Sequence, residues 1–145
     1  MPIKILVVDD SLTVRVILKR LLANVVGLPQ MEVLEADNGL AALAILRAEH
    51  PDLVLADLNM DKMTGLEMIE HMRADPTLAS IPVAAISSEG NDGVTRALAL
   101  KGVCAFIQKP FDLGILAELL PRMLAKADGG SLHRRKLEFR HASMS

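Results

Sequence analysis

Aromatic residues and cysteine are scarce in this chain of 145 residues, which has three Phe, no Trp, no Tyr and one Cys. Proteins that bind single-stranded nucleic acid stack its bases on aromatic side chains, and this chain offers almost none. The single cysteine, Cys104, cannot form an internal disulfide, and no group of Cys and His has the spacing of a zinc site. These absences exclude a base-stacking protein, a disulfide scaffold and a zinc-binding module.

The chain also lacks a strong excess of either charge and any long apolar run. Its formal net charge is −2, which is too balanced to indicate a nucleic-acid-binding protein. No apolar run reaches the roughly 18 residues of a membrane span. The apolar start of the chain is interrupted by Lys4 and ends at Asp9, unlike a signal peptide. We therefore expect a soluble, cytoplasmic protein with no membrane insertion and no direct contact with nucleic acid.

The charges are unevenly distributed along the chain. Of 16 basic and 18 acidic side chains, residues 131–145 hold four and one, which leaves 12 and 17 for residues 1–130. The Gly-Gly pair that begins at Gly129 indicates a hinge before this basic segment. We expect one domain over 1–128, large enough for its own core, and a flexible basic tail over 129–145. This tail is interpreted as a disordered or vector-encoded extension. The alternatives are a basic arm that docks on the acidic body or on a partner, and the start of an output domain that has been cut away.

Short apolar segments alternate with segments of helical periodicity. The apolar segments are nearly continuous, which is typical of parallel strands buried on both faces, whereas 31–36 alternates charged and apolar residues as an edge strand does. Strands alternating with helices predict an α/β, flavodoxin-like, doubly wound (βα)5 fold with a five-stranded parallel sheet in the order 2-1-3-4-5. The expected strands are 3–8, 31–36, 52–57, 81–86 and 103–107. The expected helices follow Ser11, Asn38, Gly65 and Asp112, and a further helix is expected over 91–100.

Polar residues follow four of these strands. Asp9 and Asp10 end the first strand, Asp57 the third, Ser87 the fourth and Lys109 the fifth. Because ligands of open parallel sheets bind outside the carboxyl ends of the strands, we expect these side chains to lie at one edge.

Three carboxylates at one edge require a positive partner. Two of them about 4 Å apart repel by roughly 4 kcal/mol at an effective dielectric near 20, so the group must raise a pKa or recruit a cation. Mg²⁺ is bound by one or two carboxylates together with phosphate oxygens, and the amine of Lys109 suits a phosphoryl oxygen. An aspartate can itself be the nucleophile and form an aspartyl phosphate. The pattern therefore predicts Mg²⁺-dependent phosphoryl transfer.

Four segments carry a more specific signal. They are Val7-Val8-Asp9-Asp10-Ser11, Asp57-Leu58-Asn59-Met60 with Gly65, Ile86-Ser87, and Phe106-Ile107-Gln108-Lys109-Pro110. Together they resemble the receiver domain of two-component response regulators, most closely the single-domain chemotaxis type. The resemblance covers about residues 2–126.

This resemblance implies a role for each residue at the carboxyl edge. Asp57 would accept a phosphoryl group from a histidine kinase, with small acyl phosphates as alternative donors. Mg²⁺ would be bound by Asp10 and Asp57 directly, by Asp9 largely through water, and by the backbone carbonyl of Asn59. Lys109 would bridge a carboxylate at rest and a phosphoryl oxygen afterwards.

The resemblance also implies a switch and an output surface. Ser87 would donate its hydroxyl to the phosphoryl group, and Phe106 would occupy the aromatic switch position. Asn59 and Glu89 match members of the family whose phosphoryl group is short-lived. Phosphorylation would then remodel the surface of the fourth helix, fifth strand and fifth helix for an output partner. The chain would act as a monomer or weak dimer, and as a phosphoacceptor that catalyses only its own phosphorylation and dephosphorylation.

The sequence departs from the family pattern at four positions. Ser87 stands where Thr is commonest, Phe106 lacks a phenolic hydroxyl, and Asp61 stands where Pro is usual. Pro121 lies inside the last expected helix and predicts a kink there.

Three other interpretations compete with the chemotaxis type. One is a receiver excised from a transcription factor or hybrid kinase. The second is a phosphatase of the haloacid-dehalogenase type, whose Asp-x-Asp pattern and cap domain differ from the adjacent acids here. The third is a binding module that is never phosphorylated, against which the complete set of acids, hydroxyl and amine argues.

Overall fold

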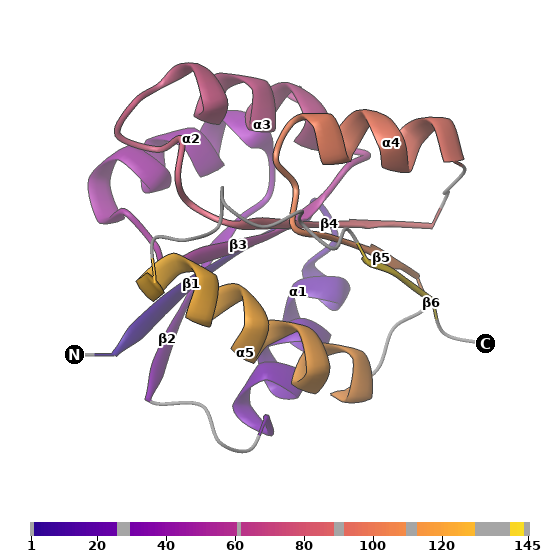
Figure 1. Ribbon diagram of the computed structural model, residues 1–145. Coiled ribbons are helices and arrows are strands. Elements are labelled where there is room, and N and C mark those ends of the chain that lie inside the picture. Colours follow the sequence, from indigo (N-terminus) through magenta and orange to yellow (C-terminus); the bar gives the residue numbers. More distant parts are fainter. Residues whose placement is uncertain are drawn as a thin grey trace.

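The fold is an open parallel sheet with helices on both of its faces (Figure 1). The computed structural model describes residues 2–25, 30–60, 62–88, 92–109, 113–129 and 140–143. The strands are β1 (Ile3–Val8), β2 (Met31–Ala36), β3 (Leu53–Asp57), β4 (Val83–Ser87), β5 (Ala105–Gln108) and β6 (Arg140–Ser143). The helices are α1 (Leu12–Ala23), α2 (Gly39–Glu49), α3 (Gly65–Ala74), α4 (Asp92–Leu100) and α5 (Leu113–Gly129).

The predicted arrangement of the five strands is confirmed. The strands lie in the order β2-β1-β3-β4-β5-β6, and every pair is parallel. The chain therefore reverses direction across the sheet at β1, which pairs with both β2 and β3. Crevices at such a reversal, outside the carboxyl ends of the strands, are where ligands of this fold class bind.

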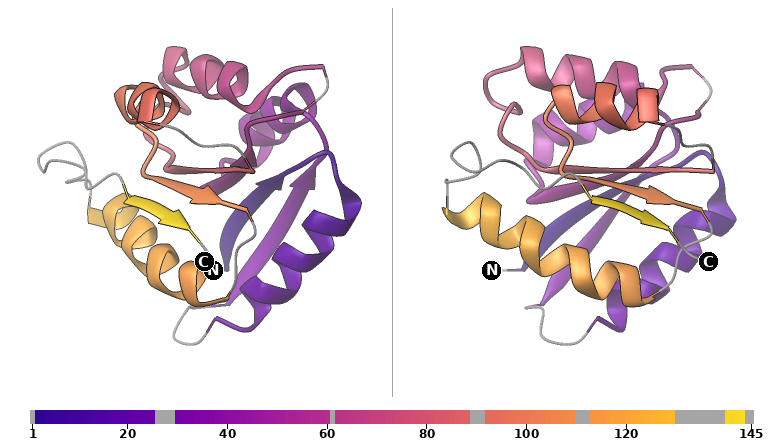
Figure 2. Two further views of the ribbon diagram at one scale, coloured as in Figure 1. Left: turned by 90° about the vertical axis from the view of Figure 1, so that its right-hand side faces the viewer. Right: turned by 45° about the vertical axis from the view of Figure 1, so that its right-hand side comes forward.

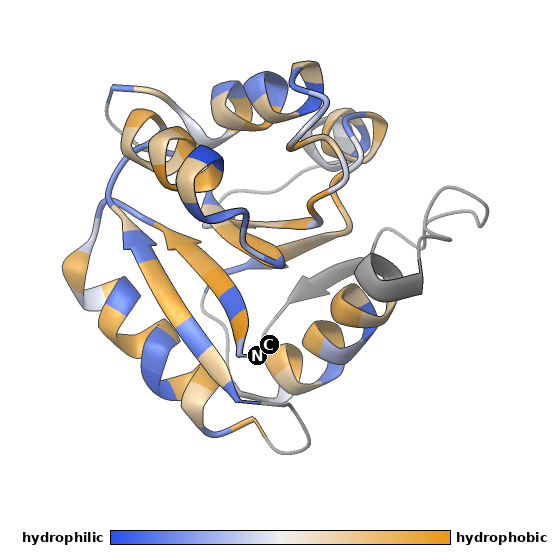
Figure 3. Ribbon diagram, turned by 90° about the vertical axis from the view of Figure 1, so that its left-hand side faces the viewer, coloured by the Kyte–Doolittle hydropathy of each residue, from blue (hydrophilic) through white to orange (hydrophobic). Residues whose placement is uncertain are grey.

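Two hydrophobic cores hold the helices to the sheet. One core, between the sheet and α2, α3 and α4, includes Leu46, Met68, Leu98 and Phe106. The other core packs α1 and α5 on the opposite face, as the views in Figure 2 show. Figure 3 shows hydrophobic residues concentrated in the strands and on parts of the helices.

Local side-chain hydrogen bonds fix where the first helices begin. The hydroxyl of Ser11 accepts the amide of Val14 at the start of α1, and the Asn38 side chain accepts the amide of Ala41 at the start of α2. At α3 the side chains of Thr64 and Glu67 each accept the other's backbone amide, forming a capping box. These bonds set the direction in which the chain leaves each carboxyl end.

The sheet has a sixth strand that the sequence analysis did not expect. Residues 140–143 lie in the segment interpreted as a flexible tail, yet they form β6 and pair with β5. The sequence Arg-His-Ala-Ser has no apolar alternation, so pattern reasoning cannot find it. The strand instead forms through backbone pairing with the edge of β5, which would otherwise present unpaired amides and carbonyls.

The last helix, α5, includes Pro121 and ends at Gly129, beyond its expected end near Lys126. α5 is one continuous helix through Pro121, which is exposed. On either side of it, Leu120 and Met123 remain buried against the sheet. Among the residues singled out from the sequence, Asp61, Glu89, Pro110 and Asp112 lie outside the described residues.

Within the part of the chain that the structure describes, no helix has the length and apolar character needed to cross a membrane.

Candidate functional site

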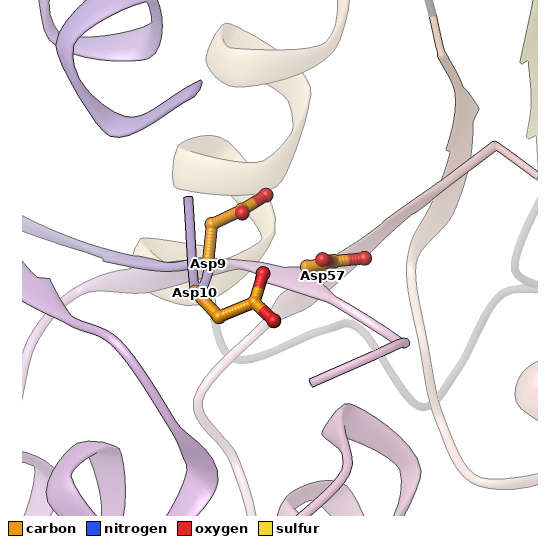
Figure 4. Close-up of side chains that lie close together, drawn as sticks. All are labelled: Asp9, Asp10 and Asp57. Atoms are coloured by element: carbon orange, nitrogen blue, oxygen red, sulfur yellow. The ribbon is translucent and has the colours of Figure 1, made fainter. Parts of the chain in front are cut away.

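Three aspartates meet at the carboxyl ends of β1 and β3 (Figure 4). Since Val8 of β1 lies opposite Ala56 of β3, the residues that follow each of them are neighbours. One carboxylate oxygen from each of Asp9, Asp10 and Asp57 lies within 4.8 Å of the others. Asp9 and Asp57 are buried, whereas Asp10 is exposed. The sequence prediction that these acids converge is therefore confirmed.

Lys109 brings one positive charge to this cluster. Its Nζ lies 3.3 Å from Oδ2 of Asp9 and 3.7 Å from Oδ2 of Asp57. Its backbone amide donates to the carbonyl of Ser87 at 2.8 Å, which fixes the start of the side chain relative to β4. We call Asp9, Asp10, Asp57 and Lys109 the acid pocket. With all four groups ionised, the acid pocket carries a net charge of −2.

Asp57 is held in an environment that disfavours its charge. Burial raises the pKa of its carboxyl above the ordinary value, and the nearby charges of Asp9 and Asp10 add to this. The backbone amide of Asn59, which donates to Oδ1 of Asp57 at 3.2 Å, and the amine of Lys109 lower that pKa. Desolvation is the largest of these effects. A partner that brings positive charge to Asp57 is therefore favoured.

Hydrogen bonds hold both the side chain and the backbone of Asp9 in place. Its Oδ1 accepts the amide of Ser11 at 2.9 Å, and its own amide donates to the carbonyl of Ala36 at 3.1 Å. Arg15 adds a contact that sequence reasoning missed, because Nη1 donates to the carbonyl oxygen of Asp9 at 2.6 Å. Nε of Arg15 also pairs with Glu35 at 3.0 Å. An arginine on a helix gives no sign in the sequence of which carbonyl it will reach.

The loop after Asp57 turns back tightly because residue 65 is glycine. A Cβ atom at Gly65 would lie 2.2 Å from the carbonyl oxygen of Asp57 and 2.9 Å from Cα of Leu58. The amide of Gly65 donates to the carbonyl of Leu58 at 3.1 Å. Any side chain here would displace the end of β3 and with it the carboxylate of Asp57.

A hydrogen bond links the side chains of Ser87 and Asn59. Ser87 is 1% exposed, and its Oγ accepts a hydrogen bond from the side-chain amide of Asn59 at 3.3 Å. This link joins the loop after β3 to the end of β4, and no spacing in the sequence predicts it. Phe106 is fully buried, in the core that also contains Leu98 of α4.

The family follows from comparison with known proteins. The model of the response regulator receiver domain matches residues 5–121. The chain belongs to this family.

Several receiver proteins resemble it along most of its length. It is 34% identical over 126 residues to chemotaxis protein CheY of Pseudomonas aeruginosa, covering 87% of this chain and 99% of that protein. It is 37% identical over 123 residues to CheY-3 of Vibrio cholerae, covering 85% and 92%. The solved structure of the chemotaxis response regulator CheY4 of Vibrio cholerae superimposes with a TM-score of 0.76 at 27% identity, covering 86% of this chain and all of that one. These relatives favour the chemotaxis type over a receiver excised from a larger regulator.

The acid pocket of this receiver domain fits the Mg²⁺ that receiver domains bind. Mg²⁺ prefers oxygen ligands and uses one or two carboxylates together with waters and phosphate oxygens. Three carboxylate oxygens within 4.8 Å supply such ligands. A divalent cation would neutralise the net charge of −2 of the acid pocket. The donor chemistry is therefore that of a hard divalent ion, with no soft ligand among these three residues.

Proposed function

We propose that this chain is a phosphorylation-activated signalling switch whose phosphoacceptor is Asp57. The observation that carries the proposal is the acid pocket itself, in which a buried aspartate lies 3.7 Å from an amine and beside two further carboxylates. Phosphoryl transfer requires mainly positioning of the acceptor and neutralisation of charge, and this arrangement supplies both.

The transfer uses one oxygen of Asp57 as the nucleophile. This oxygen attacks the phosphorus of a phosphohistidine in the kinase, forming an O–P bond as the N–P bond breaks and its electrons return to the imidazole. The Nζ of Lys109 then pairs with a phosphoryl oxygen instead of with the aspartates. In a separate hydrolysis step, water attacks the phosphorus as the O–P bond to Asp57 breaks, which releases inorganic phosphate and a proton and restores the carboxylate.

Four oxygen donors of this chain would hold Mg²⁺. Carboxylates of Asp10 and Asp57 would bind it directly, Asp9 through water, and the backbone carbonyl of Asn59 would complete the set. When bound, the ion neutralises charge on the acceptor and on the phosphoryl oxygens.

Ser87 and Phe106 would transmit the modification to the surface. The added phosphoryl charge attracts the hydroxyl of Ser87, which must exchange its bond with Asn59 for one with the phosphoryl group. Because Phe106 shares a core with Leu98, a shift of the segment after Ser87 changes the packing of α4 on the sheet. The surface of α4, β5 and α5 thereby changes for an output partner.

The phosphoryl group is expected to be short-lived. Asn59 and Glu89 would set this lifetime, and rapid loss suits signalling that must follow a changing stimulus. A phosphorylated form that persists for hours in Mg²⁺ would contradict this part of the proposal.

Mass spectrometry of the intact chain tests the proposal. Incubation with an acyl phosphate and Mg²⁺ should add one phosphoryl group to the wild-type chain and none without Mg²⁺. Asp57→Ala should gain nothing, whereas Asp52→Ala, which changes an exposed aspartate just before the start of the same strand, should gain as the wild type does. Metal-independent phosphorylation, or phosphorylation of Asp57→Ala, would overturn the proposal.

The same preparation identifies the pathway. The chain activated with beryllofluoride should capture an output protein through the face of α4, β5 and α5, and the chain without it should capture less. The identity of the captured protein distinguishes chemotaxis from the excised-receiver alternative, in which the output is a kinase or is linked to DNA.

A further inference from the structure

The outer edge of β5 is covered by a strand from the same chain. β6 runs parallel to β5 over its whole length, with Ala105 opposite Arg140 and Gln108 opposite Ser143. Both views of Figure 2 show β6 beside β5 and pointing the same way. An uncovered edge strand presents a row of unpaired amides and carbonyls and is a template for a further strand. In this chain, that template is occupied.

The connection that brings β6 there has the form of the rest of the fold. α5 leads back from the end of β5 to the start of the next parallel strand, so β5, α5 and β6 make a βαβ unit. Ten residues separate Gly129 at the end of α5 from Arg140 at the start of β6. Such a short covalent link gives the tail an effective concentration at the β5 edge on the order of millimolar.

The backbone amide and carbonyl of Phe106 point toward β6. The amide of Lys109, just after β5, donates to Ser87 of β4. Successive amides of an extended strand point to alternate sides, so, counted back from Lys109, the amides of Phe106 and Gln108 are directed away from β4 and toward β6. The amide of Cys104, which also donates to β4, lies before the first residue of β5 and outside this alternation.

The register then assigns the partners on β6. Phe106 lies opposite His141, and in a parallel pair such a residue bonds to the two neighbours of the residue opposite it. The carbonyl of Arg140 and the amide of Ala142 are therefore the partners of Phe106. The amide of His141 points to the outside of the sheet.

We propose that the edge of β5 is a strand-addition site and that residues 140–143 of this chain are its resident occupant. The second part of the inference rests on the proposed function: an output partner that uses the surface of α4, β5 and α5 must compete with β6. The tail is then an intramolecular competitor for the output surface, bound beside the residue assigned to the switch.

The distribution of charge supports an occupant from the tail. Residues 131–145 carry four basic and one acidic side chains, and residues 1–130 carry five more acidic than basic ones. Attraction between these two parts of the chain favours docking and weakens as salt screens it.

Amide hydrogen exchange with two neighbouring proline variants tests the proposal. Ala142→Pro removes an amide that donates to β5, whereas His141→Pro removes one that points outward, which an edge strand tolerates. In Ala142→Pro the amides of Phe106 and Gln108 should exchange about tenfold faster than in the wild type. In His141→Pro they should exchange at the wild-type rate.

Three results would overturn the proposal. The first is an unchanged exchange rate in Ala142→Pro, and the second is equal acceleration in both variants. The third is protection that increases with protein concentration, which means that a second copy supplies the strand.

A peptide distinguishes this inference from the proposed function. A synthetic peptide of residues 138–145, added to the full-length Ala142→Pro chain, should restore protection of Phe106, and a scrambled peptide should not. If neither peptide restores it, the site does not take an added strand. Phosphorylation of the same variant by an acyl phosphate is measured separately, so failure of Asp57 to accept phosphate leaves the result on the strand unaffected.

Discussion

The buried charge of Asp57 is the residue-scale feature on which the site depends. The structure surrounds it with two other carboxylates and one amine, and burial raises the pKa of Asp57. A raised pKa means that the folded chain holds the proton more tightly than the unfolded chain does. The ionised aspartate therefore lowers the stability of the fold when no divalent cation is bound.

We predict that Asp57→Asn stabilises the metal-free chain at neutral pH by about 1–3 kcal/mol. The gain should shrink as pH falls through the raised pKa of Asp57, and should vanish below the ordinary pKa of an aspartate, where both forms are neutral. Denaturant unfolding in a chelating buffer across this pH range measures the difference. Asp52→Asn, at an exposed aspartate, serves as the control, and a destabilised Asp57→Asn chain contradicts the prediction.

The bond between Asn59 and Ser87 restrains the hydroxyl assigned to the switch. Asn59→Ala removes the donor 3.3 Å from Oγ of Ser87, so the hydroxyl turns toward a phosphoryl group at lower cost. We expect this variant to bind beryllofluoride about 3–10-fold more tightly in Mg²⁺. Asn24→Ala, which removes an exposed side chain bonded to Arg20 of its own helix, should bind like the wild type. Weaker binding by Asn59→Ala would mean that the amide contacts the phosphoryl analogue itself.

At this scale the sequence predicted the acids and the amine but not what holds them. The position of a residue at the end of a strand follows from the topology of the sheet. The sequence could therefore predict that Asp9, Asp57 and Lys109 lie close together. The contacts of Arg15 with Asp9 and of Asn59 with Ser87 depend on rotamers and on exact distances between loops. No spacing in the sequence encodes those.

At the level of helices and strands, the position of each element depends on how closely it can approach its neighbours. Gly65 lets α3 start directly against the end of β3, and an added Cβ would lie 2.2 Å from the carbonyl oxygen of Asp57. We predict that Gly65→Ala destabilises the chain by about 1–3 kcal/mol and weakens Mg²⁺ binding, because the end of β3 must move. Thermal unfolding and Mg²⁺ titration measure the two effects.

Gly93 provides a matched control for that substitution. It is exposed in α4, where alanine is the better helix former, so Gly93→Ala should stabilise the chain by about 0.5–1 kcal/mol. The same chemical change is thus expected to have opposite signs at two positions. Equal effects at both would contradict the steric argument.

Arg73 ties the end of α3 to the segments on both sides of it. Its guanidinium donates to the carbonyls of Ala79 and Ile81 before β4, and of Lys101 and Gly102 after α4. Burial lowers the pKa of this group. The C-terminal end of α4 is therefore anchored.

We predict that Arg73→Met destabilises the fold by about 2–4 kcal/mol, since several carbonyls lose their donor. Arg73→Lys, which keeps the charge but has fewer donors in a different geometry, should recover part of the loss. Chemical denaturation of the three chains measures this, and equal stability of wild type and Arg73→Met would refute it.

Five strands could be predicted at the element scale and one could not. The first five strands are largely apolar because both their faces are buried, and such apolar segments can be recognised in the sequence. β6 pairs with β5 on one edge only and does so through its backbone. Its sequence, Arg140-His141-Ala142-Ser143, therefore has no apolar pattern that would predict a strand. Strand β4 begins at Val83 rather than at Ile81 as expected; the intervening Pro82 has no amide to donate.

At the scale of the whole molecule, a cation bound to the acid pocket should stabilise the entire fold. Ligand binding to the folded state at a hundred times its dissociation constant adds about 2.7 kcal/mol, which for a chain of this size raises the Tm by roughly 5–10 °C. We predict such a rise with Mg²⁺. Differential scanning calorimetry measures it.

Two variants separate specific binding from a general effect of salt. Asp10 is exposed, so Asp10→Asn should fold normally yet lose most of the Mg²⁺-dependent rise. Asp52→Asn should keep the full rise. If both variants respond as the wild type does, Mg²⁺ acts elsewhere on the chain.

The parallel direction of β6 has a practical meaning for reporter design. A chain that ended with α5 would finish at the amino ends of the strands, on the far side from the acid pocket. Because β6 crosses the molecule once more, a fluorophore attached just after Ser143 would emerge on the same side as Asp57. A dye placed there would lie at the same end of the sheet as Asp57, three strands away from it.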